Sequence, residues 1–187
     1  MTISISPRGS RWSVATQWKP VIAAGIVACG SPMNNNPSAE VAIEIRVVPD
    51  TIVLGRGEFT TATFQLQISN RTTQRLFVER CGTFQFPGFV LERQTGATWL
   101  TEYGTICPSV RDAPLLVEPN ATRAYEESVA HSPRQDVAPR FLSADPTGVY
   151  RLRIGAAFWD YDPVTDSRQR FLKPELMYSA PFHIVLR

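Results

Sequence analysis

The densest group of reactive side chains lies near the C-terminus, where three aspartates and two aromatic residues fall within eight positions. Asp160, Asp162 and Asp166 share this segment with Trp159 and Tyr161. Clustered carboxylates supply the oxygen ligands that calcium prefers, about six to eight in a complete site. The spacing is not that of an EF-hand loop, and the glycine which that loop needs is absent. We therefore expect no metal here and interpret the segment as a polar connection between the last two strands.

The same connection is the best candidate for a contact surface. Long loops at the end of a β-domain often carry function, and this one combines aromatic and acidic side chains that suit a protein or a sugar. The candidate binding residues are Trp159, Asp160, Tyr161 and Asp162. The alternative is a solvated connection that binds nothing.

The two histidines do not complete a catalytic arrangement. A serine or cysteine hydrolase needs a nucleophile, a base within hydrogen-bond reach and a third group that orients the base. His183 alternates with apolar residues in a C-terminal strand, whereas His131 stands beside Ser132 and Pro133 in an expected solvated loop. The G-x-S-x-G, H-E-x-x-H and phosphate-binding glycine motifs are absent from the sequence. We expect no enzyme activity, no catalytic residue and no cofactor.

A different kind of chemistry is indicated at Cys29, which ends a short apolar run that begins at Val21. The run follows a basic leader without acidic residues and precedes a polar stretch, and these are the parts of a processed export signal. Nine residues are too few to span a bilayer, which takes about 20. The tetrad Ile26, Val27, Ala28 and Cys29 resembles the lipobox of bacterial lipoproteins.

This resemblance implies cleavage before Cys29 and attachment of a lipid to its thiol. Residues 1–28 would be the signal peptide, residues 29–39 a flexible tether rich in Asn, Pro and Ser, and residues 40–187 the folded domain. The domain would be lipid-anchored at the cell membrane or outer membrane and face the periplasm or the exterior. Gly30 stands where lipoproteins retained at the inner membrane have aspartate, which favours the outer membrane. Plain secretion, a cytosolic protein and a start later than Met1 are the alternatives.

The other two cysteines, Cys81 and Cys107, form an even pair in the body of the chain. In an exported protein such a pair is expected to form a disulfide. The bond would close a loop of roughly 27 residues and stabilise the fold by about 3 to 4 kcal/mol. Two free thiols are the alternative; zinc is disfavoured because it needs about four ligands and only the two histidines could add to the pair.

Charge argues against nucleic acid as a partner. The leader contains three of the 19 Lys and Arg residues and none of the 17 Asp and Glu residues, which leaves 16 basic and 17 acidic residues after position 28. A nucleic-acid-binding protein shows a clustered basic excess, whereas these charges are interspersed and Lys173 is the only lysine after the leader. The remaining 159 residues fit one domain with a core of ordinary size.

Short alternating apolar runs separated by turn residues predict an all-β fold. The predicted strands are 41–48, 59–69, 76–78, 89–91, 98–100, 115–117, 121–129, 149–158 and 181–186. Eight or nine strands at this spacing predict a two-sheet, immunoglobulin-like sandwich. The apolar segment 84–89 lies close to Cys81 in sequence, and we expect it to pack beneath the disulfide.

Residues 145–151 resemble the corner before the penultimate strand of immunoglobulin-like domains. A turn containing Pro146 and Gly148 leads into a strand with Tyr150, and in that corner the tyrosine hydroxyl bonds back to the preceding chain. Leu152 stands where antibody domains have their second cysteine, so an antibody-type inter-sheet disulfide is not expected.

Residues 51–130 are similar to BsuPI-like proteinase inhibitor domains, which are small exported sandwiches of bacteria. The similarity is carried by residues 64–70, Cys81, residues 90–93 and residues 116–119. No inhibitory loop can be assigned from it. Together the resemblances imply an envelope protein that binds another envelope protein or a polysaccharide without catalysis. The alternative is a proteinase inhibitor or envelope regulator on the same fold.

Overall fold

The computed structural model describes residues 42–108, 112–132 and 141–187. The predicted signal peptide, the tether and the lipidation site Cys29 lie outside these residues. The described part contains 12 strands and one short 3₁₀ helix, η2 (Pro174–Met177), which confirms the all-β prediction. No helix in these three ranges is long and apolar enough to cross a membrane.

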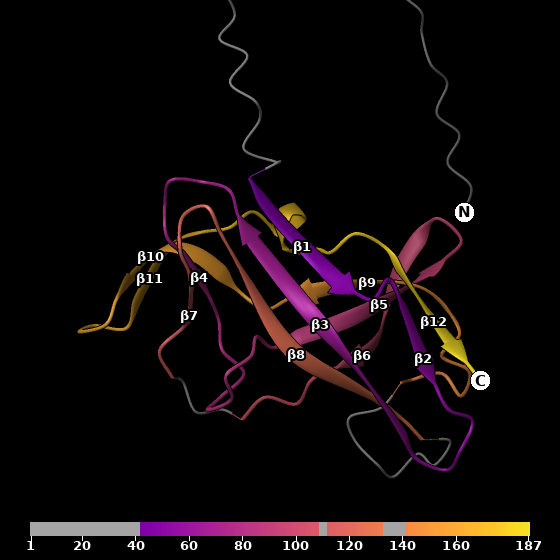
Figure 1. The fold of residues 1–187 in the computed structure, drawn as a ribbon. Helices are drawn as coiled ribbons and strands as arrows, with labels where there is room; N and C mark the ends of the chain where they lie inside the picture. The colour runs from indigo at the N-terminus through magenta and orange to yellow at the C-terminus, as the bar shows by residue number, and fades with distance from the viewer. Residues whose placement is uncertain (1–41, 109–111, 133–140) are drawn as a thin grey trace, which may run out of the picture. The chain divides into compact units, whose positions relative to one another are not determined.

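The strands form three sheets (Figure 1). The front sheet has the order β1 (Ile43–Val48), β3 (Thr60–Asn70) and β8 (Ala121–His131). The back sheet has the order β2 (Thr51–Leu54), β12 (Phe182–Leu186), β9 (Gly148–Ile154), β5 (Phe89–Thr95) and β6 (Thr98–Gly104). The side sheet has the order β11 (Ser167–Phe171), β10 (Ala157–Asp162), β4 (Leu76–Val78) and β7 (Leu115–Val117). Among the strands of the described residues, only β2 and β12 pair in parallel.

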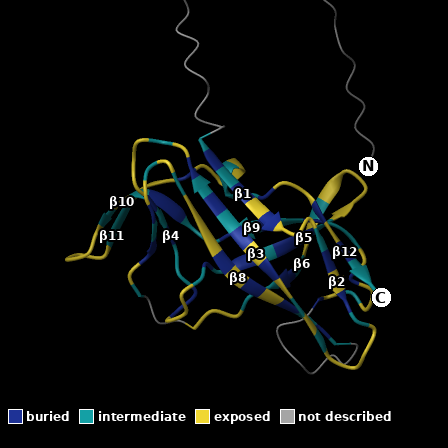
Figure 2. Cartoon of the chain, in the orientation of Figure 1, coloured by how far each residue is buried: buried dark blue, intermediate teal, exposed yellow. Residues whose placement is uncertain are grey.

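The front and back sheets enclose a shared core, as the alternation of the sequence predicts. Buried and exposed residues alternate along β3 and β8 (Figure 2), because successive side chains of a strand point to opposite faces. The ring of Phe64 on β3 meets that of Phe89 on β5 edge to face, with 5.7 Å between centroids. The immunoglobulin-like sandwich is therefore present.

The strand number exceeds the predicted eight or nine because short strands were missed and one long run is divided. Residues 149–158 form nearly all of β9 and the start of β10, with a bend at Gly155 and Ala156. Gly155 N–H donates to Gly88 O at 2.9 Å, and Ala156 O accepts from Glu79 N–H at 2.8 Å. These bonds lead the chain out of the back sheet and into the side sheet.

The predicted Cys81–Cys107 disulfide is confirmed, with Cα atoms 4.8 Å apart. It joins the segment that follows β4 to the segment that follows β6. Gly88 packs directly against it, since a Cβ at this position would lie 2.8 Å from Cys107 Sγ. The bond therefore links two segments that are 26 residues apart in sequence, and Gly88 packs against it.

Candidate functional site

The predicted binding loop is not a loop. Trp159, Asp160, Tyr161 and Asp162 lie in β10, which continues through a short turn into β11. The two strands pair antiparallel, from Phe158 with Phe171 to Asp162 with Ser167. The sequence prediction failed because none of residues 159–162 and 167–171 is buried and polar residues dominate β11, so the alternation of a half-buried strand is missing.

The carboxylates of this hairpin have partners within it. Arg170 Nη2 donates to Asp160 Oδ1 at 2.7 Å, and this contact lowers the pKa of Asp160. Asp162 accepts from Val164 N–H at 2.9 Å and from Thr165 Oγ1 at 2.7 Å, which closes the turn. Among the described residues no group of three or more His, Cys, Asp or Glu side chains is placed to hold a metal.

The histidines differ in position. His183 is exposed on β12 and pairs with Val149 and Thr51, so its assignment to a strand face was correct. His131 was expected in a solvated loop, and that expectation was wrong. It is the last residue of β8, only 5% exposed, with its ring 6.5 Å from that of Phe141.

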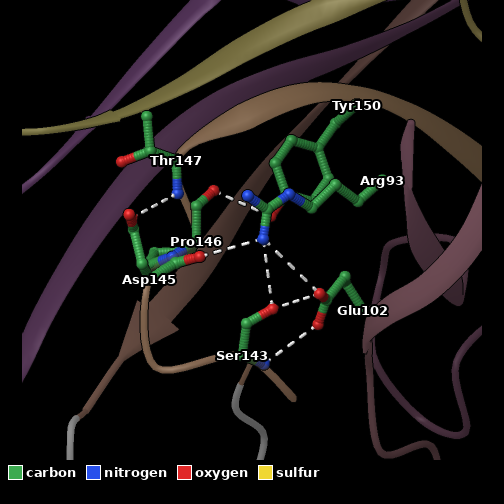
Figure 3. A network of polar contacts seen from close by, with 7 residues as sticks. All are labelled: Arg93, Glu102, Ser143, Asp145, Pro146, Thr147 and Tyr150. Atoms are coloured by element: carbon green, nitrogen blue, oxygen red, sulfur yellow. Dashed lines mark hydrogen bonds and ion pairs between the residues drawn. The ribbon is translucent and has the colours of Figure 1, made fainter. Parts of the chain in front are cut away.

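The tyrosine corner is confirmed by a direct hydrogen bond (Figure 3). Tyr150 Oη donates to Pro146 O at 2.7 Å. The turn itself is closed by Thr147 N–H, which donates to Asp145 Oδ1 at 2.9 Å and lowers the pKa of that carboxyl. The corner therefore ties the start of β9 to the preceding loop.

An ion pair extends this corner toward β5 and β6 (Figure 3). Arg93 Nη1 donates to Asp145 O at 3.0 Å and to Ser143 Oγ at 3.2 Å, and lies 3.7 Å from Glu102 Oε1. Glu102 Oε2 accepts from Ser143 N–H at 3.0 Å, and its Oε1 accepts from Ser143 Oγ. Because both carboxylate oxygens are occupied by protein donors, we assign this corner network a structural role.

A pocket of about 390 Å³ is lined by arginines from three parts of the chain, Arg80, Arg153 and Arg168. Arg168 Nη1 lies 3.2 Å from Glu79 Oε1, and Arg153 Nε lies 3.4 Å from Glu92 Oε1. Arg153 and Arg168 thus each have an acidic partner within the protein, whereas Arg80 Nε and Arg168 Nε are buried without a hydrogen-bond partner among the described residues.

A second opening, which we call the Glu127 groove, has a volume of about 460 Å³ and lies beside the second half of β8. Its wall contains residues from β3, β6 and β8, from the segment before β3 and from the two segments joined by the disulfide. The lining residues are Phe59, Thr61, Thr63, Cys81, Phe84, Phe86, Tyr103, Thr105, Ile106, Glu126, Glu127, Ser128 and Ala130.

Large apolar side chains of this groove are open to solvent. Phe59 is 56% exposed, Phe84 46% and Ile106 65%. Phe84 stacks on Phe86 with 5.1 Å between ring centroids, while Phe89 is buried in the core. The expectation that segment 84–89 packs beneath the disulfide was therefore wrong for Phe84. Apolar groups gathered at a concave surface are typical of ligand-binding sites.

Within the groove, Glu127 is only 4% exposed. It pairs in register with Phe64 of β3 and lies between the inward-facing Tyr125 and Val129, so its side chain follows the buried face of β8. Its Oε1 is buried without a hydrogen-bond partner, and burial raises the pKa of this carboxyl to about 8. Buried polar groups are nearly always paired, and a strongly shifted carboxyl in a cleft marks a candidate functional site.

The sequence analysis did not single out Glu127, although one signal for it is present. In the run 121–129 the alternation places Tyr125, Glu127 and Val129 on the same face. A charged residue at an apolar position of a strand is unusual. That signal indicates burial, but the apolar neighbours from distant segments become visible only in the fold.

Comparison with known proteins gives little information about this site. No family model and no curated protein matches the chain. Northeast Structural Genomics Consortium target SoR45 is 11% identical, with a TM-score of 0.37, over 76% of this chain and 84% of that one. The Pseudomonas fluorescens alkylpurine DNA glycosylase AlkC, bound to DNA containing an abasic site analogue, is 12% identical, with a TM-score of 0.30, over 76% of this chain and 30% of that one.

Proposed function

We propose that this chain is a lipid-anchored protein of the cell envelope whose sandwich domain binds a ligand in the Glu127 groove without catalysing a reaction. The observation that carries the proposal is a buried carboxyl oxygen without a partner, set in a groove with exposed Phe59, Phe84 and Ile106. An unpaired buried polar group costs about 1 to 3 kcal/mol. A bound ligand that supplies the missing donor would offset this cost.

The anchor is supported by two features of the sequence. The lipobox-like tetrad ends at Cys29, and the remaining cysteines form a disulfide, which is typical of exported proteins. At no more than about 3.6 Å per residue, a tether of some ten residues would hold the domain within roughly 35 Å of the lipid. The ligand would accordingly be met at the membrane surface.

The anchor is tested by the intact mass of the protein extracted from membranes of its native host. The expected mass is that of residues 29–187 plus a diacylglyceryl or triacyl group, rising by about two units on reduction of the disulfide. An unmodified chain that retains residues 1–28 would contradict the anchor.

The binding role is tested by photocrosslinking in the same host. A p-benzoyl-phenylalanine placed at Phe84 in the groove is expected to give a discrete adduct. The matched control is Phe171, which is 60% exposed on β11, outside the lining of the groove. Equal labelling at both positions, or none at Phe84, would contradict a ligand in the groove.

The alternative role as a proteinase inhibitor makes a different prediction in this experiment. An inhibitor would give an adduct whose partner is a proteinase, and the purified pair would form a stable complex with loss of proteolytic activity. An adduct with a protein that has no proteolytic activity, or with a polysaccharide, would favour the binding role.

A further inference from the structure

The free edge of β8 adjoins the Glu127 groove and presents unpaired backbone groups. Ala130 N–H donates to Tyr103 Oη at 3.4 Å, so it points away from β3. Backbone groups of successive residues in a strand alternate in direction. The backbone N–H and C=O groups of three further residues, Ala124, Glu126 and Ser128, therefore also point away from β3. Within the described part of the chain, none of these groups forms a hydrogen bond to another strand.

This edge differs from the other sheet edges in length and surroundings. With 11 residues β8 is the longest edge strand of the three sheets, whereas β1, β2, β6, β7 and β11 have between three and seven. A second pocket, of about 410 Å³, adjoins its first half and is lined by Ala124 and Tyr125. An open, long edge strand is a template for pairing with another extended chain.

The charges along the edge specify what kind of chain would fit. Glu126 and Glu127 are the acidic residues among those that line the Glu127 groove, and no basic residue lines it. An ammonium or guanidinium group would give Glu127 Oε1 the donor it lacks, and hydrogen bonds between charged groups are the strong ones. The pocket beside the first half of β8 is lined by Arg80 and Arg123, so the edge is positive there.

We propose that the β8 edge binds an extended peptide segment of a partner protein, which adds as a fourth strand to the front sheet and places a Lys or Arg side chain against Glu127. This inference rests on the proposed binding role of the groove. Main-chain bonds to Ala124, Glu126 and Ser128 would provide affinity, and the basic side chain between Phe84 and Tyr103 would provide specificity.

The test is an array of blocked seven-residue peptides with varied apolar and threonine flanks. The central residue is lysine, arginine, norleucine or glutamate, and binding to the folded domain is measured by fluorescence. Lysine and arginine peptides are expected to bind at least about tenfold more tightly than their norleucine counterparts, a difference of about 1.4 kcal/mol. Equal binding of norleucine, or a preference for glutamate, would overturn the assignment.

Two variants on the same strand distinguish a specific contact between the basic side chain and Glu127 from a general attraction to the acidic edge. Glu127→Gln removes the buried carboxylate without loss of volume and is expected to abolish the preference for lysine. Glu126→Gln removes the same charge from the adjacent, exposed position and is expected to weaken the binding of all peptides alike by a small factor, as for a surface charge, while the preference for lysine over norleucine is kept. If both variants lose the preference equally, Glu127 is not the recognition group.

Amide hydrogen exchange distinguishes strand addition from a side-chain contact alone. On peptide binding, the amides of Ala124, Glu126 and Ser128 are expected to become protected. Binding without this protection would overturn strand addition, and a concentration-dependent dimer through β8 would assign the edge to a second copy. If every peptide fails while Phe84 still forms its adduct in the host, the peptide inference falls and the proposed function stands.

Discussion

Glu102 and Glu127 lie on strands that contact each other through Tyr103, yet their carboxylates have opposite surroundings. Glu102 accepts from Ser143 through both oxygens and pairs with Arg93. Glu127 is more deeply buried, and its Oε1 accepts nothing. A carboxylate whose bonds are all made inside the protein serves the fold. A buried carboxyl oxygen without a partner weakens the fold, and at Glu127 we propose that a ligand supplies this partner.

The largest expected effect in this comparison is the pH dependence of stability that Glu127 causes. Its pKa is about 8 in the folded state against an ordinary value of 4.5. Between these values the unfolded chain releases a proton that the folded chain retains, so stability falls as pH rises from about 4.5 to 8 and is constant above. Glu127→Gln is expected to be more stable than wild type by several kcal/mol, at most about 5, at pH 8.5 and equal to it at pH 4.

Chemical denaturation of the two proteins at several pH values measures this difference. Carboxyls with lowered pKa values, such as those of Asp145 and Asp160, change stability only below about pH 5 and are shared by both proteins. If the curves stay parallel from pH 5 to 8.5, Glu127 is solvated or paired, and the comparison with Glu102 fails.

Replacing Glu102 is expected to destabilise the domain, which is the opposite of the effect expected for Glu127→Gln. Glu102→Ala would remove the carboxylate that pairs with Arg93 and leave Ser143 N–H without its acceptor, and it is expected to destabilise the domain by about 2 kcal/mol at pH 7. Urea unfolding gives the value. A neutral result would mean that the corner network contributes nothing, and the structural role assigned to it would be wrong.

A smaller loss of folding stability is expected at the tyrosine corner. Tyr150→Phe removes the hydroxyl that donates to Pro146 O and leaves the ring in the core, so the cost should be about 1 kcal/mol. Ligand binding in the Glu127 groove should be unchanged. A loss of binding in this variant would show that corner and groove are coupled.

The smallest effect is expected in the β10–β11 hairpin. The ion pair between Asp160 and Arg170 is exposed, and such pairs contribute little. Asp160→Asn should leave the melting temperature unchanged, as differential scanning calorimetry would show. If the Asp160→Asn variant instead abolished the photocrosslink at Phe84, the surface first predicted at Trp159 to Asp162 would again be a candidate binding site.

The sequence predicted those features that depend on local pattern. Alternation located β1 and β3, the resemblance of residues 145–151 to an immunoglobulin-like corner predicted the bond of Tyr150, and counting cysteines identified the disulfide. It could not predict the groove, because Phe59, Phe84 and Ile106 come from three separate segments. Alternation shows on which face Glu127 lies, but only the fold shows what covers that face.

The Cys81–Cys107 bond determines when the groove is complete. The segments it joins contribute Phe84 and Phe86 on one side and Thr105 and Ile106 on the other, so both walls are fastened by one covalent link. A newly made chain whose thiols are still reduced lacks that link. The binding surface would then be completed only where an oxidant is present, and the protein would not engage its partner before it arrives there.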